Sequence, residues 1–143
     1  VSDLVGEKLD ERHVAAALAA AERATGMRSE FAMLVPSGQK EAERLGYLLL
    51  LEFGPSVSEG ARCAQYWAES VEVELQRNFH YAHARRLGQL EPVRPVRVRK
   101  GARAYEQARK AEGARAATVK MPALSRAQKE SSAWWMGAVA SDE

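Results

Sequence analysis

Three polar side chains of different chemistry recur at helical spacing near the middle of the chain. Asn78, Tyr81 and Arg85 are separated by three and then four residues, so on a helix they would lie on one face. An amide, a phenol and a guanidinium in this arrangement could contact a polar substrate, or they could fasten the end of the helix to the next segment. Because buried polar groups need hydrogen-bond partners inside the protein, we favour the structural role.

Other residue types that commonly carry chemistry form no recognisable site. The three histidines have no carboxylate or cysteine at ligand spacing, so we expect surface histidines and no metal site. Cys63 is the only cysteine, which argues against an internal disulfide and a thiolate zinc centre. Five of the ten residues from Arg94 to Arg103 are basic, yet the net charge of the chain is only +2. This basic run predicts a solvated strand face, with contact to phosphate or RNA as the alternative.

Helices and strands must position these groups, and the hydrophobic pattern predicts their order. Asp10 as an N-cap and Gly26 as a stop predict a helix over residues 11–25, with Val14, Leu18 and Ala21 on its apolar stripe. Residues 31–35 and 46–53 are strand-like and should pair antiparallel around a long polar tip. The second strand is apolar on both faces, which is typical of a central strand covered on both sides.

The second half of the chain should contain a long helix, a strand and a shorter helix. The spacing of Ser56 and Glu59 fits a capping box, so a helix should begin there and could continue to residue 87 with a bend or fraying. Gly88 and Pro92 then end the helix and prevent its resumption. Residues 93–99 alternate as an edge or half-exposed strand that closes at Gly101, and a charged helix follows over residues 102–112.

The predicted order, with a short extended or looped segment over residues 3–9, is β-α-β-β-α-β-α. It defines an α+β fold with a small mixed sheet and helices packed on it. We expect one domain over residues 1–124 and a polar tail over residues 125–143. The tail carries Trp134 and Trp135 and would either dock on the domain or be disordered.

Length and composition set the remaining limits on the class of protein. The 143 residues suffice for one hydrophobic core, and 46% hydrophobic with 28% charged residues is ordinary for a globular domain. The longest apolar run, from Tyr47 to Leu51, is far shorter than a transmembrane helix requires, and no leader-like segment opens the chain. We therefore expect a cytoplasmic protein. Because the sequence starts at Val1 rather than at methionine, we also expect a piece of a longer protein or a processed product.

In this order the segments resemble the C-terminal domain of the Gretchen Hagen family, the auxin-responsive acyl acid amido synthetases and their relatives. The resemblance covers roughly residues 3–122. Its central run consists of residues of the same type at the same spacing, namely Asn78, Tyr81, Arg85, Gly88, Leu90, Pro92 and Gly101. Lys120 and Pro122 resemble a later lysine and proline of the family, and Glu7 with Lys8 lies where the family has an acidic residue followed by lysine.

The resemblance implies a place in the adenylate-forming superfamily, whose enzymes have a large N-terminal domain and a small, mobile C-terminal one. This chain would be the mobile domain, and its partner would be the N-terminal adenylation domain of the same protein. The full protein would be an ATP-dependent ligase that binds ATP and Mg²⁺, adenylates a carboxylic acid and forms an amide with an amino acid. The fragment alone should be inactive, since it contains no nucleotide-cradling glycine loop.

Two lysines are the candidate catalytic residues that the resemblance implies. Both half-reactions need positive charge near phosphates, which a lysine on a rotating domain can supply at one stage and remove at the next. Lys8, beside the expected hinge, is the first candidate for a catalytic and nucleotide-binding contact, and Lys120 is the second. Without the resemblance, each would be interpreted as a solvated surface lysine.

A different class of function is the alternative. A small α+β module could use the arginine-edged strand to bind nucleic acid, or it could serve as a protein interaction domain without catalysis. A nucleic-acid module would lose affinity steeply as salt rises, whereas a ligase domain should bind no nucleic acid at physiological salt. We favour the ligase domain and expect neither a membrane nor a nucleic acid as its partner.

Overall fold

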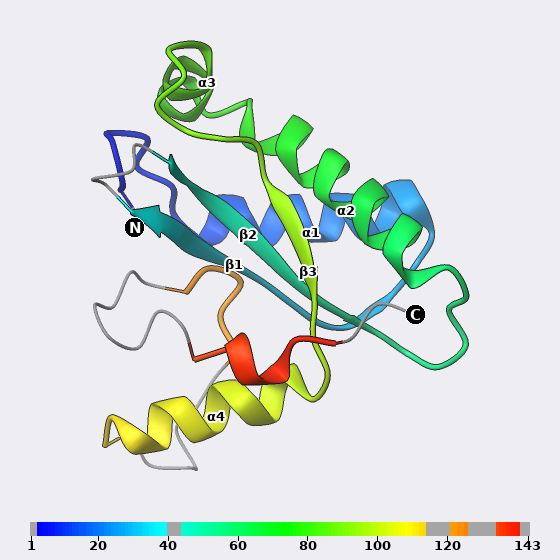
Figure 1. The fold of residues 1–143 in the computed structure, drawn as a ribbon. Helices are drawn as coiled ribbons and strands as arrows, with labels where there is room; N and C mark the ends of the chain where they lie inside the picture. Colours follow the sequence, from blue (N-terminus) through cyan, green and yellow to red (C-terminus); the bar gives the residue numbers. More distant parts are fainter. Residues whose placement is uncertain (1–2, 40–43, 114–120, 126–133, 141–143) are drawn as a thin grey trace.

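A small mixed sheet with helices on both of its faces forms the framework of the molecule. The computed structural model describes residues 3–39, 44–113, 121–125 and 134–140 (Figure 1). In chain order the elements are α1 (Glu11–Thr25), β1 (Ser29–Gln39), β2 (Arg44–Phe53), α2 (Gly60–Leu75), α3 (Phe79–Arg86), β3 (Arg94–Arg97), α4 (Gly101–Ala111) and the 3-10 helix η4 (Met136–Ala138). The predicted α+β class is confirmed.

The three strands lie in the order β1-β2-β3. β1 and β2 form the expected antiparallel hairpin, in which Leu34 pairs with Leu49. β3 runs parallel to β2, with Val96 opposite Leu50, after a crossover through α2 and α3. The predictions of a central β2 and an edge β3 are confirmed. The polar linker does not form a long tip, because Pro36 to Gln39 and Arg44 to Leu45 continue the ladder; residues 40–43 lie outside the described residues.

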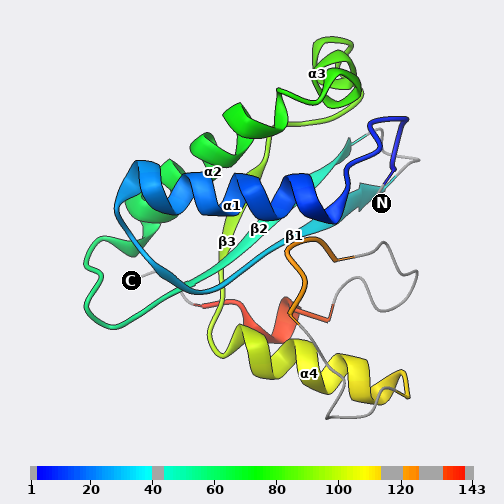
Figure 2. The ribbon, with the colours of Figure 1, turned by 180° about the vertical axis from the view of Figure 1, so that it is seen from behind.

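Alternate residues of β2 face two separate hydrophobic clusters. Leu49 and Leu51 pack with α1 and α2 on one face, together with the buried Trp67. Leu48 and Leu50 pack on the other face, toward α4 and Trp134. The two views agree with this layering, since α1 and α2 lie together on one side of the sheet and α4 lies on the other (Figures 1 and 2). The sheet is therefore covered on both faces, as expected for strands that are apolar throughout.

Local capping signals set both ends of α1, as predicted. The Asp10 carboxylate accepts a hydrogen bond from the His13 N–H at 2.7 Å, and Gly26 adopts a left-handed conformation with φ of 70°. Val14, Ala17 and Ala21 form the buried stripe. Leu18, which was predicted on that stripe, is only partly buried.

The predicted long helix is two helices, with the break at residues 76–78. α2 begins at Gly60 rather than near Ser56, so the predicted capping box is wrong. The reason is a turn in which the Val57 N–H donates to the Gly54 carbonyl at 3.1 Å, while Glu59 adopts a left-handed φ of 54°. At the other end, the Asn78 side chain accepts from the Tyr81 N–H at 3.0 Å and caps α3. The expected bend is therefore confirmed as a new helix start.

Two further boundaries differ from the prediction. Residues 3–10 form a turn and loop instead of a first strand, so the chain begins with α1. Gly101 is the first residue of α4 rather than the end of a strand, because the Glu52 carboxylate accepts the N–H groups of Lys100 and Gly101 at 2.8 and 3.0 Å. α4 otherwise matches its predicted range to within one residue.

Both outer edges of the sheet are partly covered by later parts of the chain. On β1, the Leu34 N–H donates to the Ala123 carbonyl at 2.8 Å. Beside β3, the Arg99 N–H donates to the Ala138 carbonyl and the Ala140 N–H donates to the Arg97 carbonyl, both at 2.8 Å. Residues 134–140 therefore dock on the domain. The sequence had left open whether this segment docks or is disordered. The predicted boundary after residue 124 stays a prediction.

The helices give no sign of a membrane span. None of those in the described ranges combines the length and the apolarity that crossing a bilayer requires.

Candidate functional site

Lys8 lies in the loop before α1, between two residues that are completely buried. The side chains of Glu7 and Leu9 have no solvent exposure, whereas Lys8 is exposed. Its φ of 50° is a left-handed conformation that residues other than glycine adopt rarely and at a cost. The loop therefore presents a solvent-facing ammonium group from a backbone that is anchored on both sides.

Glu7 supplies much of this anchoring. Its carboxylate accepts hydrogen bonds from the backbone N–H groups of Leu4 at 2.7 Å and Val5 at 2.8 Å. The hydroxyl of Tyr47, on β2, donates to the same carboxylate. Because these hydrogen bonds come from the loop itself and from β2, this one buried side chain fixes the loop to itself and to the sheet. Asn78 adds a long contact of 3.5 Å from its Nδ2 to the Lys8 carbonyl.

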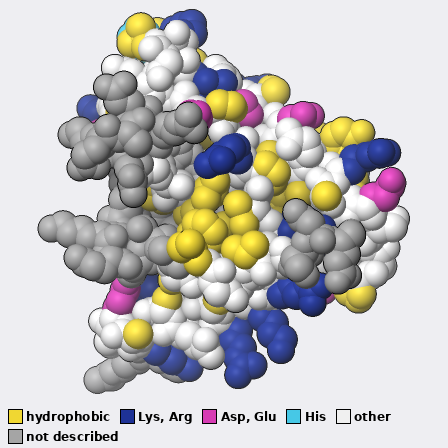
Figure 3. Space-filling view, in the orientation of Figure 1, with side chains coloured by type: hydrophobic (Ala, Val, Ile, Leu, Met, Phe, Trp, Pro, Cys, Tyr) yellow, Lys and Arg dark blue, Asp and Glu magenta, His cyan; other side chains and the backbone are white. Residues whose placement is uncertain are grey.

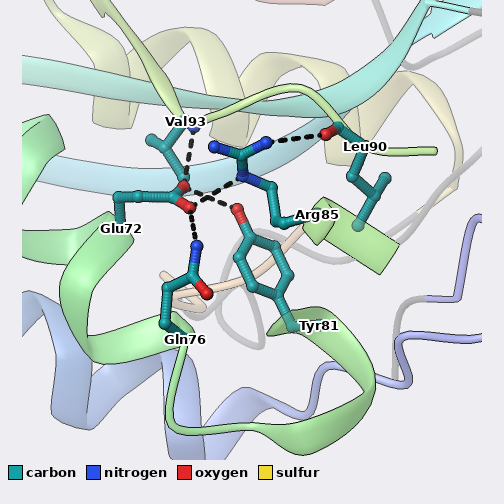
Figure 4. Close-up of polar contacts among 6 residues, drawn as sticks. All are labelled: Glu72, Gln76, Tyr81, Arg85, Leu90 and Val93. Atoms are coloured by element: carbon teal, nitrogen blue, oxygen red, sulfur yellow. Dashed lines mark hydrogen bonds and ion pairs between the residues drawn. The ribbon is translucent and has the colours of Figure 1, made fainter. Parts of the chain in front are cut away.

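Glu72 is the hub of a second polar cluster, which joins α2, α3 and the segment that enters β3 (Figure 4). Its carboxylate accepts from the Tyr81 hydroxyl at 2.7 Å, from Arg85 Nε at 2.9 Å, from the Val93 N–H at 3.0 Å and from Gln76 Nε2 at 2.7 Å. Arg85 also donates through Nη1 to the Leu90 carbonyl at 3.1 Å. The Tyr81 hydroxyl and two nitrogen atoms of Arg85 are thus engaged in contacts within the protein.

The protonation of this cluster follows from its contacts. Burial alone would raise the pKa of the Glu72 carboxyl, but hydrogen bonds from Arg85, Tyr81, Val93 and Gln76 outweigh it and hold the pKa below its ordinary value. Burial and the negative charge of Glu72 raise the pKa of Tyr81 well above its ordinary value. The phenol is therefore a neutral donor and Glu72 an ionised acceptor across the physiological range.

The predicted structural role of Asn78, Tyr81 and Arg85 agrees with these contacts. Sequence reasoning missed Glu72, because it lies on α2 and meets Tyr81 and Arg85 only after the chain turns at residues 76–78. The one signal in the sequence was a carboxylate next to Val71, at the border of the apolar stripe. A helix spacing rule cannot connect residues across a break between helices.

The second candidate, Lys120, lies outside the described residues. The segment that follows it is anchored by Glu11, in the first turn of α1, whose carboxylate accepts from the N–H groups of Ala123 at 2.5 Å and Leu124 at 3.0 Å. Lys8 precedes Glu11 by three residues and Lys120 precedes Ala123 by three residues. One carboxylate thus ties together the segments that follow the two candidate lysines.

The basic run does not form one continuous surface. A Cβ placed on Gly60 would lie 2.6 Å from Arg97 Nη2, so the Arg97 guanidinium packs closely against the start of α2. Arg99, Lys100 and Arg103 lie farther along and line a pocket beside α4. Within the described ranges, no three or more histidine, cysteine or acidic residues are grouped so that they could hold a metal ion.

The fold defines the class first: the chain is a small α+β domain with a three-stranded mixed sheet. Residues 12–129 match the model of the GH3 family C-terminal domain. The chain therefore belongs to the GH3 family, and the resemblance found in its sequence is confirmed. No curated protein matches the sequence. The family does not favour the alternative of a separate nucleic-acid or interaction module.

Solved structures of the same family share the fold. A GH3.15 acyl acid amido synthetase superposes with a TM-score of 0.69 at 14% sequence identity, over 94% of this chain and 25% of its own length. A structure described as AtGH3.15 acyl acid amido synthetase in complex with 2,4-DB gives a TM-score of 0.67, also at 14% identity, over 99% of this chain and 26% of its own length. The chain thus spans about a quarter of these proteins.

Proposed function

We propose that the chain is the C-terminal domain of an ATP-dependent ligase that adenylates a carboxylic acid and then forms an amide with an amino acid. The observation that carries the proposal is the family match over residues 12–129. The likeness in fold to two acyl acid amido synthetases supports it. Its partner would be an N-terminal adenylation domain in the same polypeptide, and the single cysteine is compatible with the cytoplasm as the site of action.

In such a reaction a carboxylate oxygen attacks the α-phosphorus of ATP and pyrophosphate leaves. The amine of the amino acid then attacks the acyl carbon, and AMP leaves with the phosphate oxygen. In both steps negative charge develops on the phosphate oxygens of the leaving group. Positive charge close to these oxygens therefore lowers the activation barrier of each step. Mg²⁺ would neutralise charge on the phosphate oxygens of the nucleotide.

Lys8 suits the role of the phosphate-contacting residue. Its loop is fixed by the buried Glu7, so the ammonium group is carried by a backbone that loses little entropy when it meets a ligand. The strained φ of 50° is the kind of local cost that proteins retain at functional positions. A rotation of the domain would bring the ammonium group to the phosphates for one step and withdraw it for the next.

Lys120 is the second candidate in this proposal. The segment that follows it is held at Glu11, so both lysines belong to stretches that converge on the start of α1. This shared anchor is what supports a common role. The charge of Lys120 would serve the step in which Lys8 is withdrawn.

The test is ATP–pyrophosphate exchange by the full-length protein with a panel of carboxylic acids, followed by amide formation with amino acids. We expect exchange in the full-length protein and none in the isolated chain. Lys8→Ala should lower the exchange rate by about 100-fold, in the range seen when a preorganised charge contact is removed. Lys110→Ala, a lysine on the exposed face of α4, is the matched control and should leave the rate unchanged. Equal rates for both variants would remove Lys8 from the mechanism.

A further inference from the structure

A pocket of about 610 Å³ lies between α4 and the docked segment 134–138. One wall is the face of α4 formed by Arg103, Ala104, Gln107 and Ala108, and the opposite wall is formed by Trp134, Gly137 and Ala138. Arg99 and Lys100 close the end at which α4 begins. Figure 3 shows Lys and Arg side chains gathered on this lower part of the molecule, next to a hydrophobic patch. The volume is typical of sites for small molecules.

Among the described residues, the charged side chains that line the pocket are all positive. They are Arg99, Lys100 and Arg103, and no aspartate or glutamate of the described ranges is among the lining residues. Among the described residues, none of these three cations forms an ion pair, whereas Arg85 and Arg109 each lie 2.9 Å from a carboxylate. Three cations brought together without a carboxylate repel one another, and this repulsion would be relieved by a bound anion.

The walls of the pocket are held in place by contacts that do not use these side chains. Glu52 accepts the backbone N–H groups of Lys100 and Gly101 from the sheet side, and Lys100 is held at a left-handed φ of 54°. The docked segment is held by the Arg99 N–H, which donates to the Ala138 carbonyl. The Trp134 ring packs edge-on against Tyr105 at 5.2 Å. The backbone that carries Arg99 and Lys100 and the Trp134 ring are therefore held in place before a ligand binds.

We propose that this pocket binds a small molecule that carries two or more linked phosphate groups. Two guanidinium groups and one ammonium group offer many donors, and guanidinium groups recognise phosphate oxygens in a bidentate manner. A single carboxylate would leave most of these donors unused. Trp134 offers an apolar surface beside the phosphates for the remainder of the ligand.

The observations favour a small anion over RNA. The three cations line one open hollow, the net charge of the chain is only +2, and Arg97 is packed against Gly60 instead of extending the basic surface. The wall at residues 134–138 lies beyond the range matched by the family model, which ends at residue 129, whereas the lining residues from Arg99 to Ala108 lie within it. The site is also separate from Lys8 and does not depend on the function proposed above.

Isothermal titration of the 143-residue chain with inorganic pyrophosphate, at constant ionic strength, tests the proposal. We expect saturable binding that is at least about tenfold tighter than the binding of inorganic phosphate, since the second phosphate engages further cations. R99Q/R103Q should weaken pyrophosphate binding by about tenfold or more. R12Q/R23Q, which removes two exposed charges from α1 on the other side of the sheet, should change it by less than about twofold.

A second variant separates charge from folding. Ala108→Glu keeps all three cations and the helix but places a carboxylate in the lining, so it should also weaken pyrophosphate binding by about tenfold or more, while circular dichroism should show the wild-type fold. Amide resonances of Ala104 and Gly137 should shift on titration of the wild-type protein. No measurable pyrophosphate binding, equal losses in R99Q/R103Q and R12Q/R23Q, or a single-stranded RNA oligonucleotide that binds the same residues more tightly at physiological salt would overturn the proposal.

Discussion

Glu72 is the residue on which the junction of α2, α3 and the entry to β3 depends most. Its side chain is 15% exposed and that of its partner Arg85 is 24% exposed, so the pair is shielded enough for each hydrogen bond to matter. Four donors converge on one carboxylate, and each would lose its partner if the carboxylate were removed. Removal of the Glu72 carboxylate should therefore cost more folding stability than removal of any one of its donors.

Replacing Glu72 by alanine should lower the free energy of unfolding by about 3 kcal/mol, because the variant leaves the Arg85 charge and the Tyr81 hydroxyl without their acceptor. Urea denaturation followed by circular dichroism would measure the change. Glu69→Ala removes an exposed carboxylate from the same helix and should cost less than about 0.5 kcal/mol. Similar losses in the two variants would show that the cluster contributes little.

The same cluster predicts how stability depends on pH. The folded state lowers the pKa of Glu72 below its ordinary 4.5, so its contribution is complete above pH 4.5 and is lost as the pH falls through the lower, folded-state value. The folded state raises the pKa of Tyr81 above its ordinary 10.0, so stability should fall again as the pH rises beyond 10.0. The difference in unfolding free energy between wild type and Glu72→Gln should therefore shrink below pH 4.5. A difference that stays constant down to pH 2 would contradict the assignment.

Among the elements, α4 depends on a cap that comes from elsewhere in the chain. Glu52, on β2, accepts the N–H groups of Lys100 and Gly101, and no side chain within α4 replaces it. A Cβ on Gly101 would lie 2.5 Å from the Phe31 ring, so the start of the helix also packs tightly on β1. The position of α4, and with it one wall of the basic pocket, is thus fixed by the sheet.

Glu52→Ala should destabilise the chain by about 1 to 2 kcal/mol, because the exposed N–H group of Lys100 and the part-buried N–H group of Gly101 lose their acceptor. Glu106→Ala, at an exposed position of α4, provides the comparison and should be neutral within about 0.5 kcal/mol. Thermal or urea unfolding of both variants would measure the change in stability. An unchanged stability of Glu52→Ala would contradict the prediction and show that water satisfies the N–H groups of Lys100 and Gly101 equally well.

Local chemistry explains which elements could be predicted from the sequence. α1 was predicted to the residue, because Asp10 and Gly26 cap it within its own segment. The hairpin and the central strand followed from runs of apolar residues. The start of α2 was not predicted, since the signal from Ser56 and Glu59 was overridden by the turn at Gly54 to Val57. The caps from Glu52 and Glu11 and the hub at Glu72 join residues far apart in sequence, and no spacing rule could find them.

At the scale of the whole molecule, the sheet separates the two surfaces for which we propose functions, the Lys8 loop and the basic pocket. Lys8 lies on the loop that leads into α1, and α1 packs with α2 on one face of the sheet. The basic pocket is lined by residues of α4 and of the segment 134–138. Figure 1 shows both of these segments on the opposite side of the sheet from α1 and α2. A change in one site should therefore leave the other intact, because residues with no shared partners contribute independently. In the full-length protein, R99Q/R103Q should keep the exchange rate of wild type.

The most direct test of the central claim, that Lys8 delivers positive charge to phosphate chemistry on a partner domain, is the ATP–pyrophosphate exchange rate of full-length Lys8→Gly. Glycine suits the φ of 50° at this position, so stability should be unchanged or higher by up to about 1 kcal/mol, which rules out misfolding as the cause of any loss. The account predicts that exchange falls by about 100-fold in this fully folded variant. An exchange rate within about twofold of wild type would contradict it.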